Sequence, residues 1–136
     1  MNNGSSSSSS SNGRVELVFE FHSTREFAGL TLHLARPPPS TEQAHNKSAA
    51  AGLLSCIVHF ALDSGNYLGK SIRYVVVAAN NQEQQQQQPI YNVTVDLKGR
   101  IGRFLQLQLD FAGSWLLLSE VTFHSREFIK FLIFHF

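Results

Sequence analysis

The sequence contains a single cysteine, Cys56, among its 136 residues. One cysteine allows no disulfide within the chain and excludes the cysteine-rich zinc sites, which need several thiolates. Because apolar residues flank Cys56, we interpret it as a buried filler rather than a reactive thiol. A nucleophile–base pair with His59 is also disfavoured, since odd and even positions of a strand face opposite ways.

Charge and long apolar runs are also scarce. Only 15% of the residues are charged and the formal net charge is +1, so neither nucleic acid nor an anionic membrane surface is expected as a partner. The apolar stretch 128–136 is broken by Lys130 and His135 and is far shorter than the roughly 20 residues of a spanning helix. Residues 1–13 lack the cationic start and apolar core of a secretory signal. We therefore expect no direct membrane insertion and no export signal in the chain as written.

The helical period is missing, and a period of two takes its place. Apolar and polar residues alternate in segments separated by turn signals, among which turns are expected at 63–66 and 98–100. Seven strands are expected at 15–21, 30–34, 54–62, 72–79, 91–97, 105–111 and 115–123. The strand at 54–62 should bury its even positions, and 72–79 should be buried on both faces. Trp115 is either an exposed anchor in a binding patch or a core residue, and the core is favoured. Together with 43% hydrophobic residues, this pattern predicts one all-β domain, a sandwich or jelly roll.

Low-complexity stretches mark the domain boundaries. Residues 1–13, rich in Ser, Asn and Gly, are expected to be a disordered leader, and the domain should span 14–125. A proline-containing loop at 36–51 and a glutamine-rich loop at 80–89 are expected as insertions. Residues 126–136 form an apolar tail to which no role is assigned.

Two stretches near the end of the domain resemble a known family. They are GRIGRFLQ at 99–106 and DFAGSWLLLSEVTF at 110–123, and a weaker block near 15–33 agrees in order and spacing. They resemble the end of the second, discoidin-like ectodomain of the discoidin domain receptors, which are collagen-binding receptor tyrosine kinases. The resemblance implies a jelly-roll β-sandwich that is incomplete here at its N-terminal side.

The resemblance also implies a function. In that family the domain is a non-catalytic extracellular module, at the outer face of the plasma membrane, that supports an adjacent discoidin domain holding the collagen site. The chain is therefore expected not to be an enzyme, and its partners are that discoidin domain and, indirectly, collagen. The alternative is a free-standing jelly roll that binds carbohydrate or protein, because a fold does not fix function.

Particular residues follow from the same resemblance. Ser119 and Glu120 match positions that contribute calcium ligands, which implies a partial calcium half-site. Calcium needs six to eight oxygens and most ligand positions are missing here, so the alternative, that Glu120 is only a charge at a strand end, is favoured. Leu34 and Leu107 stand where the receptors have a disulfide, and we predict that these two leucines touch.

Asparagine motifs and histidines provide further candidate sites. Asn46 and Asn92 begin N-glycosylation motifs and are the expected acceptors if the chain enters the secretory route, whereas Asn3 is taken as incidental. The six histidines have no partner at a ligand spacing, so structural or solvent roles are expected; His33 and His59 are placed on the wet phases of their strands.

Overall fold

The computed structural model describes residues 12–35, 52–67, 69–76 and 90–128. They form five strands: β1 (Asn12–Ala35), β2 (Gly52–Ala61), β3 (Ile72–Val75), β4 (Ile90–Ala112) and β5 (Leu117–Glu127). All pair antiparallel in one sheet of order β3-β2-β4-β1-β5. The prediction of an all-β fold is confirmed.

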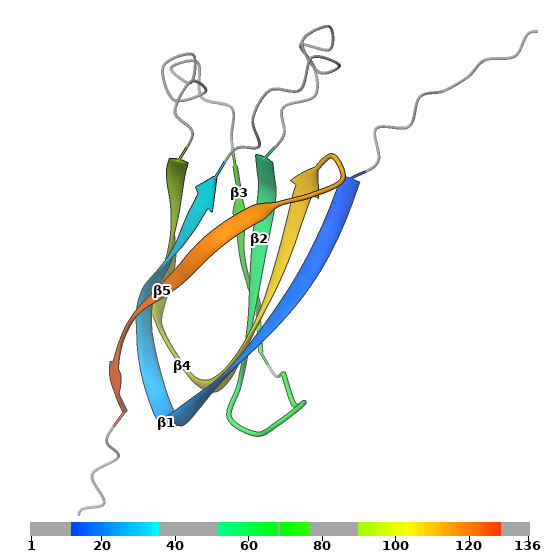
Figure 1. Cartoon of the computed structure of the whole chain (residues 1–136). Helices are drawn as coiled ribbons and strands as arrows, with labels where there is room; N and C mark the ends of the chain where they lie inside the picture. Colours follow the sequence, from blue (N-terminus) through cyan, green and yellow to red (C-terminus); the bar gives the residue numbers. More distant parts are fainter. Residues whose placement is uncertain (1–11, 36–51, 68, 77–89, 129–136) are drawn as a thin grey trace, which may run out of the picture.

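Two long strands, β1 and β4, bend the sheet over itself (Figure 1). Residues 12–20 of β1 pair with 104–112 of β4, and beyond the bend residues 29–35 pair with 90–96. The first pair of segments joins β2 and β3 in one layer, because β2 pairs with 104–112. The second joins β5 in the other layer. One sheet thus supplies both faces of a sandwich, as the jelly-roll prediction requires.

The bends are built from irregular residues. Phe27 pairs with Arg100 and Gly29 with Asp96, so residues 97–99 of β4 lie opposite a single residue of β1. Within this bulge Lys98 and Gly99 both have positive φ angles, 56° and 69°. The turn predicted at 98–100 is therefore a bulge inside one strand. For this reason five strands replace the predicted seven: 15–21 and 30–34 are parts of β1, and 91–97 and 105–111 are parts of β4.

The core lies between the two layers. Its fully buried members come from both of them and include Leu30, Leu32, Leu34, Val58, Val95, Leu97, Leu105, Leu107 and Leu109. Aromatic rings close the contact between the layers: Phe19 and Phe123 stand edge-to-face with centroids 4.9 Å apart, and so do Phe21 and Phe27. Burial of the alternating apolar face is what makes these residues strands rather than helices.

Several predictions about individual faces are wrong. A register irregularity between Leu53 and Ser55 buries Leu53 and leaves Leu54 36% exposed, so the predicted even face of β2 holds only from Cys56 to Phe60, and Leu62 beyond the strand is exposed. The strand at 72–79, expected to be buried on both faces, is an edge strand over 72–75 with Tyr74 and Val75 exposed, because it pairs only with β2. Residues 77–79 lie outside the described residues.

The C-terminal strand also differs. Trp115, expected in the core, is 62% exposed because it lies in the connection that follows Gly113, before β5 begins at Leu117. The strand continues past the predicted end at 123 to Glu127, and β1 begins at Asn12, so the folded body extends slightly beyond the predicted 14–125. The turn at 63–66 is confirmed by the Asn66 N–H, which donates to the Asp63 carbonyl at 3.3 Å.

Candidate functional site

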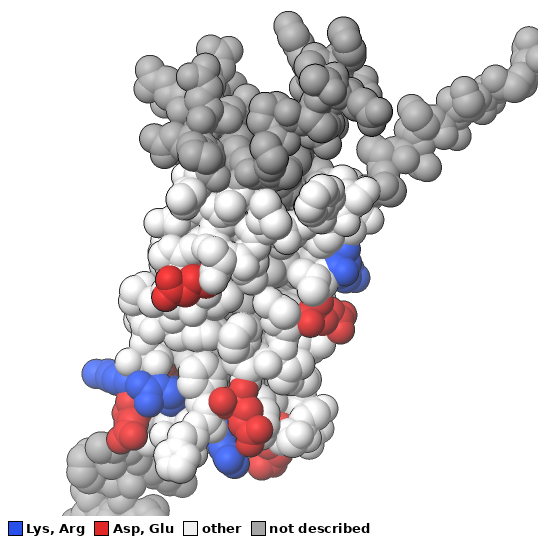
Figure 2. All heavy atoms as spheres, in the orientation of Figure 1, with Lys and Arg blue, Asp and Glu red and all other residues white. Residues whose placement is uncertain are grey.

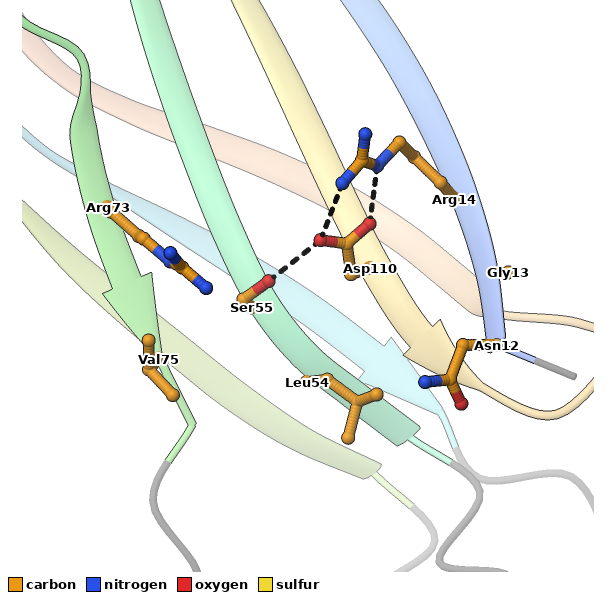
Figure 3. Close-up of a pocket in the computed structure, with 8 residues that line it drawn as sticks. All are labelled: Asn12, Gly13, Arg14, Leu54, Ser55, Arg73, Val75 and Asp110. Carbon is orange, nitrogen blue, oxygen red and sulfur yellow. Dashed lines mark hydrogen bonds and ion pairs between the residues drawn. The ribbon is translucent and has the colours of Figure 1, made fainter. Parts of the chain in front are cut away.

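The most chemically varied group of side chains lies on the outer face of the first layer. Cross-strand register places Arg14 opposite Asp110, and Asp110 opposite Ser55, so three neighbouring strands bring these residues into one row. Arg73 reaches the same place from β3 (Figure 3). These residues line an open hollow of about 580 Å³, whose other walls are Asn12, Gly13, Leu54 and Val75.

Hydrogen bonds to Asp110 organise the hollow. Arg14 donates from Nε and Nη2 to the two carboxylate oxygens at 2.6 Å and 3.3 Å, and the Ser55 hydroxyl donates at 3.1 Å. The hydrogen bond from Arg14 is the main reason that the pKa of Asp110 lies below its usual value; partial burial opposes it, and Ser55 and the charge of Arg73 assist. The same contact raises the pKa of Arg14. Asp110 is therefore held as an anion.

The charges of the hollow do not cancel. Asp110 carries one negative charge, whereas Arg14 and Arg73 carry two positive ones. Among the described residues no hydrogen bond or ion pair engages the Arg73 guanidinium, which contributes only through its field at Asp110. Space-filling shows acidic and basic side chains scattered over a mostly uncharged surface (Figure 2). The excess positive charge lets the hollow hold an anionic group.

Cys56 is not a reactive thiol. Its side chain is fully buried in the core, and burial raises the pKa of its thiol to about 12, so the thiolate does not form near neutral pH. The interpretation of Cys56 as a filler is confirmed. His59, the base of the disfavoured nucleophile–base pair, lies on the outer side of β2, and its ring centroid is 6.4 Å from that of Tyr67. The His59 side chain is half-buried rather than solvent-exposed, and its Nε2 is buried with no hydrogen-bond partner among the described residues.

A second polar group lies on the outer face of the other layer. His33 Nε2 and the Thr122 hydroxyl are 3.0 Å apart, and Thr31 contacts both Thr94 and His124 through side-chain hydrogen bonds. In the described part of the chain no three His, Cys, Asp or Glu side chains gather as metal ligands would. Each histidine here hydrogen-bonds a threonine hydroxyl, which is an arrangement that stabilises a sheet face.

Comparisons with known proteins decide the family. Residues 3–125 match the profile of "Discoidin domain-containing receptor 1/2, DS-like domain". The chain belongs to this family. It is 33% identical to the rat epithelial discoidin domain-containing receptor 1 over 120 residues, which are 83% of this chain and 11% of that protein.

Further relatives agree. The human epithelial discoidin domain-containing receptor 1 is 31% identical over 129 residues, or 90% of this chain and 12% of the receptor. The discoidin domain-containing receptor tyrosine kinase B of Caenorhabditis elegans is 30% identical over 118 residues, or 85% and 13%. The chain thus spans roughly an eighth of the curated relatives that it matches, and the match lies in their discoidin-like ectodomain. The resemblance seen in the sequence is confirmed.

The structure locates the residues that the discoidin-like family suggested as calcium ligands. Ser119 is the extra residue of a bulge in β5, and its hydroxyl donates to the His33 carbonyl at 3.0 Å. Glu120 is exposed and accepts from the Thr122 hydroxyl at 3.5 Å. A hydroxyl and a carboxylate supply too few oxygens for calcium, so the described residues alone do not fit a complete site. Calcium binding stays a prediction.

Leu34 and Leu107, which the resemblance suggested as former disulfide positions, both point into the core. Leu34 pairs with Tyr91 in the second layer, and Leu107 pairs with Leu17 and Val58 in the first. Both leucines are fully buried and belong to the same cluster. They lie on facing inner surfaces, as a disulfide between layers would require, while their direct contact stays a prediction.

The glycosylation motifs fall in different places. Asn92 lies on β4 opposite His33, with its side chain exposed on the outer face, which suits a glycan. Asn46 and Asn3 lie outside the described residues. Glycosylation of either expected acceptor stays a prediction.

Sequence reasoning did not find the hollow. The alternating pattern puts Arg14 and Asp110 on polar phases of their strands, but 96 residues separate them and only the pairing of β1 with β4 brings them together. Ser55 is at an odd position of β2, where the alternation predicts exposure to solvent, whereas it is only 5% exposed. Opposite charges on the polar phases of two strands were the one available signal.

Proposed function

We propose that this discoidin-like domain is a non-catalytic extracellular module of a collagen-activated receptor tyrosine kinase. Its role is to support and position an adjacent discoidin domain that holds the collagen site, at the outer face of the plasma membrane. The observation that carries the proposal is the family match over residues 3–125, which falls in the ectodomain of the receptors.

The geometry is suited to a supporting role. Pairing of β1 with β4 continues through both layers, so the two faces of the sandwich are joined by covalent strands as well as by packing. The Cys56 thiol is buried and its pKa is raised to about 12, so it does not act as a nucleophile near neutral pH. In the described residues, no helix is both long and apolar enough to cross a membrane.

Collagen binding tests the proposal. The full chain, a discoidin domain and a tandem of the two are applied to immobilised triple-helical collagen in a surface plasmon resonance experiment. The chain alone should give no specific response, while the tandem should bind at least as tightly as the discoidin domain and show a higher melting temperature for that domain. Collagen binding by the chain alone, or a tandem in which neither property changes, contradicts the supporting role.

A second candidate is a binding module in its own right, and the hollow favours it. Arg73 lies beside Asp110, and no hydrogen bond or ion pair engages its guanidinium in the described part of the chain; the exposed side chains of Leu54 and Val75 line the same hollow. Such a site suits a carboxylate on a protein or carbohydrate ligand. Acidic peptides and uronic acid oligosaccharides are tested against the chain, Arg73→Gln and the matched control Lys70→Gln. Binding that is lost only in Arg73→Gln supports this candidate; no binding, or equal binding by both variants, opposes it.

A further inference from the structure

One edge of the first layer is open. Residues 12–20 of β1 pair with β4 on one side, whereas β5 pairs only with residues 25–35 of β1. Among the described residues, nothing pairs with the other side of 12–20. Figure 1 shows this segment, in dark blue, at the rim of the sheet. A free edge of nine residues presents main-chain donors and acceptors to any strand that approaches it.

The same edge leaves apolar surface incompletely covered. Val15, Leu17 and Phe19 point inward but are only half-buried, whereas their cross-strand partners Leu109, Leu107 and Leu105 are fully buried. Apolar residues of β5 and of the connection before it are likewise only partly buried against the core; they are Leu116, Leu118, Val121 and Phe123. An added strand at this edge would therefore cover an apolar stripe as well as pair its backbone.

The outward row of the edge is charged, with one apolar residue. It consists of Arg14, Glu16, Val18 and Glu20. The Val18 side chain is 61% exposed, and that of Glu20 is 64% exposed with only a 3.6 Å contact to Arg103. Arg14 uses two of its nitrogens on Asp110 and keeps further N–H donors.

This segment is complementary to itself. When two copies run antiparallel about a two-fold axis at Leu17, Arg14 of each copy lies opposite Glu20 of the other. On the inner face Val15 then lies opposite Phe19, and Leu17 opposite Leu17. Directly opposite residues are the ones that interact across a ladder, so this register gives two ion pairs and a continuous apolar stripe.

Other symmetric registers are worse. An axis at Glu16 places two glutamates face to face, and an axis at Val18 places Glu16 opposite Glu20 twice. An axis between residues sets the charged row of one copy against the apolar row of the other. An axis at Val15 pairs Arg14 with Glu16 but leaves Phe19 uncovered, and Glu16 already accepts hydrogen bonds from Gln106 and Gln108.

We propose that the open edge of β1 binds the same edge of a second copy of this chain, antiparallel and centred on Leu17. The two first layers then form one continuous sheet through an isologous interface. The partner is set by charge complementarity between Arg14 and Glu20 and by the stripe formed by Val15, Leu17 and Phe19.

Disulfide trapping tests the register with the full chain. Directly opposite strand residues have Cα atoms about 4.5–5.5 Å apart, within the range of a disulfide. Leu17→Cys should therefore form a covalent dimer under mild oxidation, whereas Val15→Cys should not; the native Cys56 is buried and should not react. The proposal is overturned if Val15→Cys cross-links instead of Leu17→Cys, or if neither variant cross-links. In either case the edge does not pair with a second copy in this register.

Charge reversal tests the partner contact. Glu20→Arg would place two arginines opposite each other at both ends of the interface, and should weaken the dimer about tenfold or more in sedimentation equilibrium. Because the Glu20 side chain is exposed, the Glu20→Arg variant should still fold, and circular dichroism checks this. Glu127→Arg, an equal charge change at the exposed end of β5, is the matched control and should leave the dimer unchanged. A monomeric wild-type chain, or equal effects of both variants, contradicts the proposal.

Discussion

The Arg14 guanidinium holds the Asp110 carboxylate through two nitrogens, from a neighbouring strand and across 96 residues of sequence. Because Ser55 donates to the same carboxylate, three strands meet at one anion. This contact fixes the ends of β1, β2 and β4 relative to one another. It also ties the stability of the domain to pH.

Acid should weaken the domain through Asp110. A carboxyl whose pKa is lowered on folding stabilises the protein above its unfolded pKa of about 3.9, and this stabilisation is lost as the pH falls through the folded value. Asp110→Asn should therefore unfold more easily than the wild type at pH 7, and the difference should shrink below about pH 4. Urea unfolding over this pH range measures it.

Removing the other partner provides the control. Arg14→Gln should reduce the same pH-dependent part of the stability, and the double variant should be no worse than the sum of the two single variants. A wild-type pH dependence in Asp110→Asn would show that the contact does not form in solution.

Replacing Lys98 by glycine should stabilise the folded domain. Its φ of 56° costs a residue with a Cβ about 1 kcal/mol, and the contact of its backbone N–H with Asp96 does not depend on the side chain. Lys98→Gly should raise the free energy of unfolding by about 0.5–1 kcal/mol, after allowance for the more flexible unfolded chain. Gly99→Ala should act in the opposite direction, because φ is 69° and its Cβ would lie 3.3 Å from Glu26 Oε1. Chemical denaturation measures both, and effects of equal sign would contradict the bulge.

Gly13 should not accept a side chain. A Cβ at this position would collide with the ring of Phe111, which lies directly opposite on β4 and covers the glycine. Gly13→Val should lower the free energy of unfolding by about 1–3 kcal/mol, since the ring must leave its packed position. Gly65→Ala tests the matched case of a glycine with open space around its Cβ, where the cost comes from its φ of 78° alone. A smaller loss at Gly13 than at Gly65 would oppose this account.

An engineered disulfide should form between the two layers of the sandwich. Leu34→Cys with Leu107→Cys, in a Cys56→Ala background, should oxidise to an intramolecular bond, because both positions point into the same core cluster. The disulfide would close the loop between residues 34 and 107, and a loop of that length should stabilise the oxidised form by about 4 kcal/mol relative to the reduced one. Thiol titration and thermal melts with and without reductant measure the effect. Two free thiols in the folded protein would show that the leucines do not touch.

The sequence predicted much of the fold because alternation survives wherever one face is buried. Leu105, Leu107 and Leu109 are clean examples, all inward and fully buried. It failed where a local irregularity changes the phase, as at Leu53, or where the number of neighbouring strands decides exposure, as at Tyr74 on an edge. Periodicity carries no information on either, because both depend on which strands pair.

The candidate hollow was less predictable for a related reason. Alternation places Arg14 and Asp110 on exposed faces, yet their meeting depends on the register of two strands joined through the rest of the domain. The predicted number of strands was wrong for the same reason, because it also depends on how the strands pair. Lys98 and Gly99 read as a reversal of direction, but two positive φ angles can equally form a bulge that lets β4 continue.

The long pairing of β1 with β4 also has a mechanical consequence. The start of β1, in dark blue, and the end of β5, in red-orange, lie at opposite ends of the sandwich (Figure 1). Because Arg25 of β1 pairs with Glu127 of β5, tension applied between the two ends enters the β1–β5 pair at that end, and the hydrogen bonds there carry it first. The bent strand β1, paired with β4 along both layers, carries the load from one layer to the other.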